Sequence, residues 1–340
     1  MTGPRRRPHV ESDHTFSDQT GQTDRRIGLT RGRHLTYSLD VIPIDRPKLE
    51  GSVAVGDQRR RRIGFSEFGA PEGPAVVWLH GTPGARRQIP TEAREYAEAR
   101  GFRLIGLDRP GVGSSTEHQY ASIADFTVDF RTVLDTLGID RFSVIGLSGG
   151  GPYALAVSHF LPDRIVSTGV VGGVAPINGP DATSGGAVEL AKFMVPVMKV
   201  AQRPVGKLLS TALGVARPIA DPAISIYGRL SPEADRELLS RPEFRAMFLD
   251  DLLHGGSRRM EAPFADLQLF VSDWGFRIGD VRAHVHWWHG DADNIIPFSH
   301  GEHMVRLLPN AELHHLPGQS HLSGLGNSVE MLDVLLNAWN

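Results

Sequence analysis

The segment Gly146-Leu147-Ser148-Gly149-Gly150 has the residue types that a serine nucleophile requires. It matches the pattern G-x-S-x-G and stands between a buried apolar run, Phe142 to Leu147, and a helical pattern, Pro152 to Phe160. A nucleophilic serine sits at the apex of a tight strand-to-helix turn, where the backbone is strained and the neighbours must be small. The glycines supply that room, and Gly149 places a backbone N–H beside the nucleophile near the start of the following helix. The segment predicts Ser148 as a nucleophile, against the alternative of an ordinary glycine-rich turn.

A serine hydroxyl needs a base, and the base needs a carboxylate that orients it. Two loops later in the chain offer these groups, each directly after an apolar run. The stretch from His289 to Pro297 holds two carboxylates, Asp291 and Asp293. The stretch from Leu316 to His321 ends in a histidine on a turn. His314 and His315 lie within the preceding strand, where packing occupies side chains, so His321 is the better base.

Alternating strand and helix patterns surround these loops and must position them. The strand patterns are short apolar runs at Ala75 to Leu79, Arg103 to Leu107, Phe142 to Leu147, Ile165 to Val174, Ala283 to Trp288 and Ala311 to Leu316. The helical patterns cover Thr91 to Arg100, Ile123 to Leu137, Pro152 to Phe160 and Val329 to Trp339. This alternation predicts an α/β fold with a mostly parallel central sheet and helices on both faces. Arg59 to Arg62 follows a turn signal and is interpreted as the solvated face of a hairpin, not as a nucleic-acid patch.

One long segment interrupts the alternation. Residues 176–280 carry helical patterns at Glu189 to Val200, Pro232 to Leu253 and Pro263 to Phe276, with no convincing strand. An insertion of this size over an α/β core predicts a helical cap. The division is therefore a core of residues 46–175 and 281–340 and a cap of residues 176–280. Apolar side chains of the cap would line a pocket for a small hydrophobic substrate: Phe193, Met194, Val195, Val197, Met198, Phe264, Leu267, Phe270 and Trp274.

Composition excludes several other classes of function. The chain has 340 residues, 40% of them hydrophobic, and its 36 basic and 39 acidic residues nearly cancel, so no nucleic-acid partner is expected. It has no cysteine, which fits a cytoplasmic location. No apolar run is long enough for a membrane span, and the start does not resemble a secretory signal. Residues 1–45 are polar, and their hydrophobic residues follow neither the helical nor the strand period. This segment is interpreted as a disordered tail or as the product of a wrongly chosen start codon.

Five histidines near Asp291 and Asp293 raise the question of a metal. They are His284, His286, His289, His300 and His303. No H-E-x-x-H arrangement is present, and a catalytic role already accounts for an acid in this stretch. We therefore expect neither a metal nor a cofactor. His80 is interpreted as a structural hydrogen-bonding group, and Asp108 as a residue that fixes its own turn.

From about Ser52 onward the chain resembles the α/β-hydrolase superfamily, and most of all its bacterial esterase-type members near proline iminopeptidases and cofactor-free perhydrolases. Five motifs in order carry this resemblance: His80-Gly81-Thr82-Pro83-Gly84, Asp108-Arg109-Pro110-Gly111-Val112-Gly113-Ser114-Ser115, the serine turn, the G-x-x-D-x-x-x-P stretch from Gly290 to Pro297, and the histidine loop. The resemblance implies the α/β-hydrolase fold. It also implies Asp293 as the acid, with Asp291 as a turn residue, and the backbone amides of Thr82 and Gly149 as oxyanion donors.

The expected reaction is hydrolysis of an ester-like carboxylic substrate through an acyl-enzyme on Ser148. The same triad also hydrolyses amides, lactones, carbon–carbon bonds and N-terminal prolyl peptides. The proline iminopeptidase alternative is disfavoured because its expected Gly-Gly-Pro motif is Gly81-Thr82-Pro83 here, and no acid can be assigned to a free amine. A non-catalytic ligand-binding module is the third alternative. The sequence specifies neither the substrate nor the oligomeric state.

Overall fold

The computed structural model describes residues 44–186, 228–229, 231–252 and 261–339. Their centre is one eight-stranded sheet in the order β1-β2-β4-β3-β5-β6-β7-β8. The strands are β1 (Leu49–Val55), β2 (Arg61–Gly69), β3 (Ala75–Leu79), β4 (Arg103–Leu107), β5 (Phe142–Leu147), β6 (Ile165–Val171), β7 (Val285–Gly290) and β8 (Ala311–Leu316). β2 pairs antiparallel with β1 and β4, and all other pairs are parallel. The prediction of a mostly parallel sheet is confirmed.

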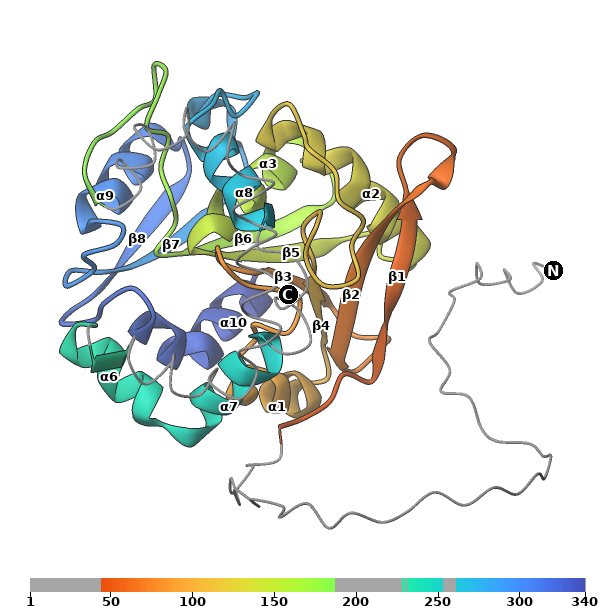
Figure 1. Ribbon diagram of the computed structural model, residues 1–340, viewed down its shortest axis with the longest axis horizontal. Coiled ribbons are helices and arrows are strands. Elements are labelled where there is room, and N and C mark those ends of the chain that lie inside the picture. Colours follow the sequence, from red (N-terminus) through yellow and green to blue (C-terminus); the bar gives the residue numbers. More distant parts are fainter. Residues whose placement is uncertain (1–43, 187–227, 230, 253–260, 340) are drawn as a thin grey trace, which may run out of the picture.

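Helices cover both faces of this sheet (Figure 1). They are α1 (Thr91–Arg100), α2 (Phe126–Thr136), α3 (Gly151–Phe160), α6 (Glu233–Ser240), α7 (Pro242–Asp251), α8 (Glu261–Phe270), α9 (Phe298–Leu307) and α10 (Ser328–Asn337). Alternate residues of a strand enter opposite cores, as the period of two requires. On β3, Val77 and Leu79 pack with residues of α2 and α3, whereas Val76 and Trp78 pack with residues of α1 and α10. Both faces of the central strands are therefore buried, which explains their continuous apolar runs.

The helices between β6 and β7 divide over the two faces. Leu238 of α6 and Met247 of α7 join the core on the side of α1 and α10. Leu269 and Phe270 of α8 join the core on the side of α2 and α3. Figure 1 shows α6 and α7 beside α1 and α10, and α8 beside α3. In the described part of the chain, no helix combines the length and the apolar character that a membrane span needs.

Several element boundaries differ from the sequence prediction. The helix predicted over Pro232 to Leu253 is two helices, because Arg241 adopts an extended conformation (φ −71°, ψ 123°) before Pro242. The strand predicted to reach Val174 ends at Val171, since Gly172 takes a positive φ of 52°. The helix predicted over Pro263 to Phe276 ends at Phe270. The predicted helix at residues 189–200 and nearly all of the predicted tail lie outside the described residues.

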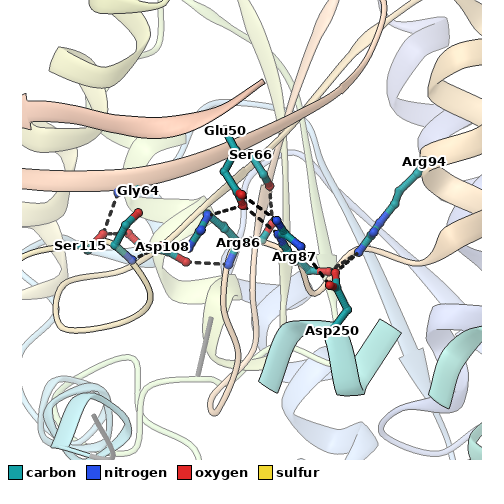
Figure 2. A network of polar contacts seen from close by, with 10 residues as sticks. Glu50, Gly64, Ser66, Arg86, Arg87, Arg94, Asp108, Ser115 and Asp250 are labelled. Carbon is teal, nitrogen blue, oxygen red and sulfur yellow. Dashed lines mark hydrogen bonds and ion pairs between the residues drawn. The ribbon is translucent and has the colours of Figure 1, made fainter. Parts of the chain in front are cut away.

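A buried network of charges holds the loop after β3 against its neighbours (Figure 2). Asp108, at the end of β4, accepts hydrogen bonds from the backbone and side chain of Arg86 (2.8 and 2.7 Å) and from Ser114 N (3.0 Å). Glu50 of β1 accepts from Arg86 and Arg87. Asp108 thus fixes its turn as predicted, and it also anchors the loop that begins at His80.

Helix α7 joins the same network through two adjacent carboxylates. Asp250 accepts from Arg87 at 2.9 Å, and Asp251 accepts from the backbone N–H of Ala85 at 3.0 Å. Asp251 is almost fully buried and has no cationic side chain among its hydrogen-bond partners in the described ranges. Burial and the nearby carboxylates of Asp108 and Asp250 raise the pKa of Asp251 to about 7. The side chain therefore holds a proton over a pH range in which the unfolded chain has released it.

Asp251→Asn is expected to make unfolding stability less dependent on pH. The raised pKa makes the native state bind more protons than the unfolded state between pH 4 and pH 7, so wild-type stability falls as pH rises through this window. The difference in unfolding free energy, variant minus wild type, should grow by on the order of 2 kcal/mol between pH 5 and pH 8. Urea unfolding at both pH values measures it. A difference that stays constant or shrinks would contradict the raised pKa.

Candidate active site

Ser148 lies at the strand-to-helix turn that its motif predicts. It follows β5 directly and opens a short 3-10 helix, Ser148–Gly150, that leads into α3. Its φ is +51°, and the other non-glycine residues with positive φ in the described ranges, Gln58 and Arg59, belong to the hairpin turn. A Cβ on Gly146 would come 2.5 Å from the carbonyl oxygen of Gly150. The turn therefore has the strain and the need for small residues that a nucleophile elbow shows.

His321 connects Ser148 with Asp293 through both ring nitrogens. Nε2 lies 2.9 Å from Ser148 Oγ, and Nδ1 lies 2.7 Å from Asp293 Oδ2. The three side chains come from the loops after β5, β7 and β8, and all three residues are buried. In this geometry Nδ1–H donates to the carboxylate, and Nε2 is free to accept the serine proton. The structure thus brings together the three residues that the sequence predicts.

Asp293 is held as a carboxylate by its surroundings. Burial by itself would raise its pKa, but contacts with His289 and His321 and the amide of Ile296 outweigh that effect and hold the pKa of Asp293 well below its usual range. Oδ1 accepts from the backbone of Ile295 and Ile296, both at 2.9 Å. Asp293 therefore stays charged beside His321 across the neutral range.

Asp291 has a different role, as the resemblance implies. Its Oδ1 accepts from Gly318 N at 2.7 Å, and its Oδ2 lies 3.0 Å from His315 Nε2. These contacts tie the loop after β7 to the loop after β8. Asp291 thus stabilises the turn while Asp293 faces His321.

The loop that begins at His80 lies beside Ser148. A Cβ on Gly81 would stand 3.6 Å from Ser148 Cβ, and one on Gly149 would stand 3.0 Å from Thr82 Cβ. The two residues predicted to bind an oxyanion, Thr82 and Gly149, therefore face each other next to the serine. The same position on Gly149 lies 2.9 Å from Phe270 Cζ, so this ring of α8 forms one wall of the site.

His80 supports this loop from behind. Its Nδ1 donates to Gly81 O at 2.7 Å, and its Nε2 accepts from Arg109 N at 3.2 Å. Burial and the nearby charge of Arg109 keep the pKa of His80 well below the usual value. A neutral, doubly hydrogen-bonded ring has the structural role that the sequence predicts.

Comparison with known proteins identifies the architecture. Residues 74–184 match the family described as alpha/beta hydrolase fold. The whole fold is similar to that of a thermophilic esterase from Thermogutta terrifontis, with a TM-score of 0.60 and 19% identity over 85% of this chain and 98% of that one. The chain therefore has the alpha/beta hydrolase fold.

Two further relatives show how this chain compares in sequence. A probable proline iminopeptidase from Leptolyngbya boryana is 38% identical over 105 residues, which cover 30% of this chain and 32% of that protein. An sn-1-specific diacylglycerol lipase from Mus musculus is 23% identical over 271 residues, which cover 77% and 80% of the two chains. The match to the iminopeptidase thus spans about a third of that protein's length.

Arg109 and Asp266 form an ion pair beside the loop that carries Thr82, and the sequence assigns a role to neither residue. Arg109 Nη2 donates to Asp266 Oδ2 at 2.8 Å and to Thr82 Oγ1 at 2.7 Å, and it also reaches Gly81 O. Asp266 accepts from Thr82 Oγ1 and from Tyr153 OH, each at 2.8 Å. The guanidinium therefore ties α8, α3 and the Thr82 loop into one unit. Arg109 stood in a recognised motif, whereas no local pattern marked Asp266.

Asp235 of α6 is a second residue that the sequence analysis missed. Its Oδ1 accepts from the backbone amides of Leu322 and Ser323, at 2.9 and 2.8 Å. These amides directly follow His321. Helix α6 therefore fixes the loop that carries the predicted base, through a pairing between residues far apart in the chain.

Proposed function

We propose that this α/β-hydrolase is a serine hydrolase that cleaves carboxylic esters through an acyl-enzyme on Ser148. The observation that carries the proposal is the hydrogen-bonded series from Ser148 Oγ through the His321 ring to Asp293, with Ser148 on a turn of positive φ. A serine with a base and an oriented carboxylate is the arrangement that acyl transfer requires.

The proposed reaction proceeds in two halves. Ser148 Oγ forms a bond to the carbonyl carbon of the ester while its proton moves to His321 Nε2, and Asp293 stabilises the resulting imidazolium. The backbone amides of Thr82 and Gly149 bind the oxyanion, where each donor contributes about 3 kcal/mol or more. His321 then protonates the leaving alcohol as the carbon–oxygen bond breaks. Water then attacks the carbonyl carbon of the acyl-enzyme while its proton moves to His321, and the carboxylic acid leaves as His321 returns the proton to Ser148 Oγ. No step calls for a cofactor.

We infer an uncharged and mainly apolar substrate. The wall that Phe270 forms beside Gly149 is apolar, and Asp266, the carboxylate that contacts Thr82, is already paired with Arg109. We further propose that residues 176–280 act as a cap, because α6 contacts the His321 loop and α8 contacts the Thr82 loop. A cap in these positions would shield the acyl-enzyme from bulk water.

An aminopeptidase acting on N-terminal proline is the second candidate, and the local identity to proline iminopeptidases favours it. Such an enzyme must neutralise a free substrate amine with a carboxylate. Asp266 has the best position for that role, but it accepts from Arg109, Thr82 and Tyr153. A carboxylate so fully engaged would have to give up these bonds to bind an amine, which disfavours the peptidase alternative.

Parallel assays of esters and amides test the proposal. We expect p-nitrophenyl esters of short and medium chain length to be hydrolysed with a kcat/KM at least about 100-fold above that of prolyl-naphthylamide, because Asp266, the carboxylate nearest to Thr82, is already paired with Arg109 and does not receive the amine. Ser148→Ala is the control for both substrates. If the prolyl amide is turned over and the esters are not, the enzyme is an aminopeptidase and the proposed substrate class is wrong.

A further inference from the structure

Four polar side chains lie together at β7 and β8, toward the ends of these strands that are opposite to the active-site loops. His284 directly precedes β7, His286 lies on β7, and Glu312 and His314 lie on β8. The register pairs His286 with Glu312 and Trp288 with His314. Residues two apart on a strand share a face, so all four side chains lie on the same face of the sheet.

Three ligand atoms of this cluster form a compact triangle. His286 Nδ1 lies 3.0 Å from His314 Nε2 and 3.7 Å from Glu312 Oε2, and the remaining side, from His314 Nε2 to Glu312 Oε2, is 3.8 Å. His284 lies next to this triangle, since one ligand atom each of His284, His286 and Glu312 lies within 4.8 Å of the other two. Two donors on a tetrahedral zinc ion, with Zn–N bonds of about 2.0–2.1 Å, are about 3.3 Å apart. The three sides of the triangle bracket that value.

One ring of the cluster is also held in place, because His314 stacks on the buried ring of Trp288 with centroids 4.7 Å apart. His284 stacks on His286 and would turn out of this stack to share an ion with it. His284 and Glu312 are exposed, whereas His286 and His314 are half-buried, so a cation can reach the donors from solvent. Fixed rings lower the entropy lost when an ion binds.

We propose that His284, His286, His314 and Glu312 form a binding site for a transition-metal dication, with Zn²⁺ as the probe ion. Imidazole and carboxylate donors suit Zn²⁺, whereas Mg²⁺ and Ca²⁺ require oxygen ligands. The sequence places these histidines only beside Asp291 and Asp293, and it argues against a metal because a catalytic role accounts for the acid there and no H-E-x-x-H arrangement is present. The structure places His289 beside Asp293 and joins His303 to the backbone of Asp181, while His284 and His286 face Glu312 instead.

A metal bound here would join β7 to β8. These two strands carry the loops of Asp293 and His321 at their other ends. An ion that binds the folded chain but not the unfolded chain stabilises the fold in proportion to its concentration and affinity. The site is therefore structural, and it lies apart from the proposed chemistry at Ser148.

Zinc titration of the full chain tests the site. After bound metal is removed with EDTA and the EDTA is removed in turn, calorimetry should detect one Zn²⁺ site in the wild type that binds more tightly than any other. Excess Mg²⁺ should not compete with Zn²⁺ for this site. His286→Ala and Glu312→Gln should each weaken that site at least tenfold, since loss of even an outer partner of a metal ligand costs about 10- to 100-fold. His315→Ala is the matched control, because His315 lies on the same strand and binds Asp291 instead. The control should bind like the wild type.

Thermal melting gives an independent measurement. Zn²⁺ should raise the Tm of the wild type and of His315→Ala, but not that of His286→Ala or Glu312→Gln. Equal binding and equal Tm shifts in all four proteins would overturn the proposal. Glu312 is exposed, so its isosteric change to glutamine keeps the test informative if His286→Ala folds poorly. Ester turnover without zinc should be the same in His286→Ala as in the wild type, which separates this test from that of the proposed function.

Discussion

Ser148→Ala is expected to lower kcat for ester hydrolysis by about five to six orders of magnitude. The variant loses the atom that bonds to the substrate carbonyl, while the oxyanion donors and the substrate pocket remain, so KM should change little. His321→Ala should cost about as much, because the serine hydroxyl then has no base at 2.9 Å. The double variant should be hardly slower than either single variant, since members of a triad act as a unit.

Steady-state kinetics with a p-nitrophenyl ester measures these losses. Ser272→Ala is the matched control, because Ser272 Oγ donates within its own helical turn to Gln268 O and has no place in the proposed reaction. The control should retain nearly full activity. Losses that multiply in the double variant would show that Ser148 and His321 act independently, contrary to the proposal.

Arg109→Met is expected to destabilise the fold by about 3–5 kcal/mol, which is the cost of leaving one partner of a buried ion pair alone. Arg109 is buried and donates to Asp266 Oδ2 through both Nε (3.0 Å) and Nη2 (2.8 Å). Its removal leaves a buried carboxylate without a counter-ion. The double variant Arg109→Met/Asp266→Leu removes both charges and should recover much of the lost stability, although Tyr153 OH then loses its acceptor.

Urea unfolding of the two single variants and the double variant measures this coupling. Arg100→Met is the control, since Arg100 pairs with Asp333 at 3.3 Å on the surface, where such a pair contributes less than about 1 kcal/mol. A double variant that is less stable than Arg109→Met would contradict the buried ion-pair account. A small loss in Arg109→Met, comparable to that of the control, would also contradict it.

The sheet and the three predicted catalytic side chains could be read from the sequence because their signals are local. A doubly buried strand such as Phe142–Leu147 needs continuous apolar residues, and a serine at positive φ needs glycines around it. The prediction of one helix over Pro232 to Leu253 was wrong, although Pro242 gave a local signal for the break because it disfavours a helical conformation at Arg241.

The residues that the sequence did not reveal act through contacts between distant segments. Asp266 pairs with Arg109 across 157 positions, and Asp235 binds amides 87 and 88 positions away. Neither pairing leaves a periodic or spaced pattern in the chain. The histidines near Asp293 had a visible pattern, but sequence proximity suggested one group, whereas the alternation of side chains along β7 places His286 and His289 on opposite faces of the sheet.

Covalent labelling tests the central claim most directly. A fluorophosphonate probe forms a bond only with an activated nucleophile, so its attachment reports the Ser148–His321 pair without any assumption about the substrate. After labelling of the full chain, digestion and mass spectrometry should find the phosphonyl group on the peptide that contains Ser148, and Ser148→Ala should not be labelled. A wild-type protein that stays unlabelled, or a label on another serine that persists in Ser148→Ala, would contradict Ser148 as the nucleophile.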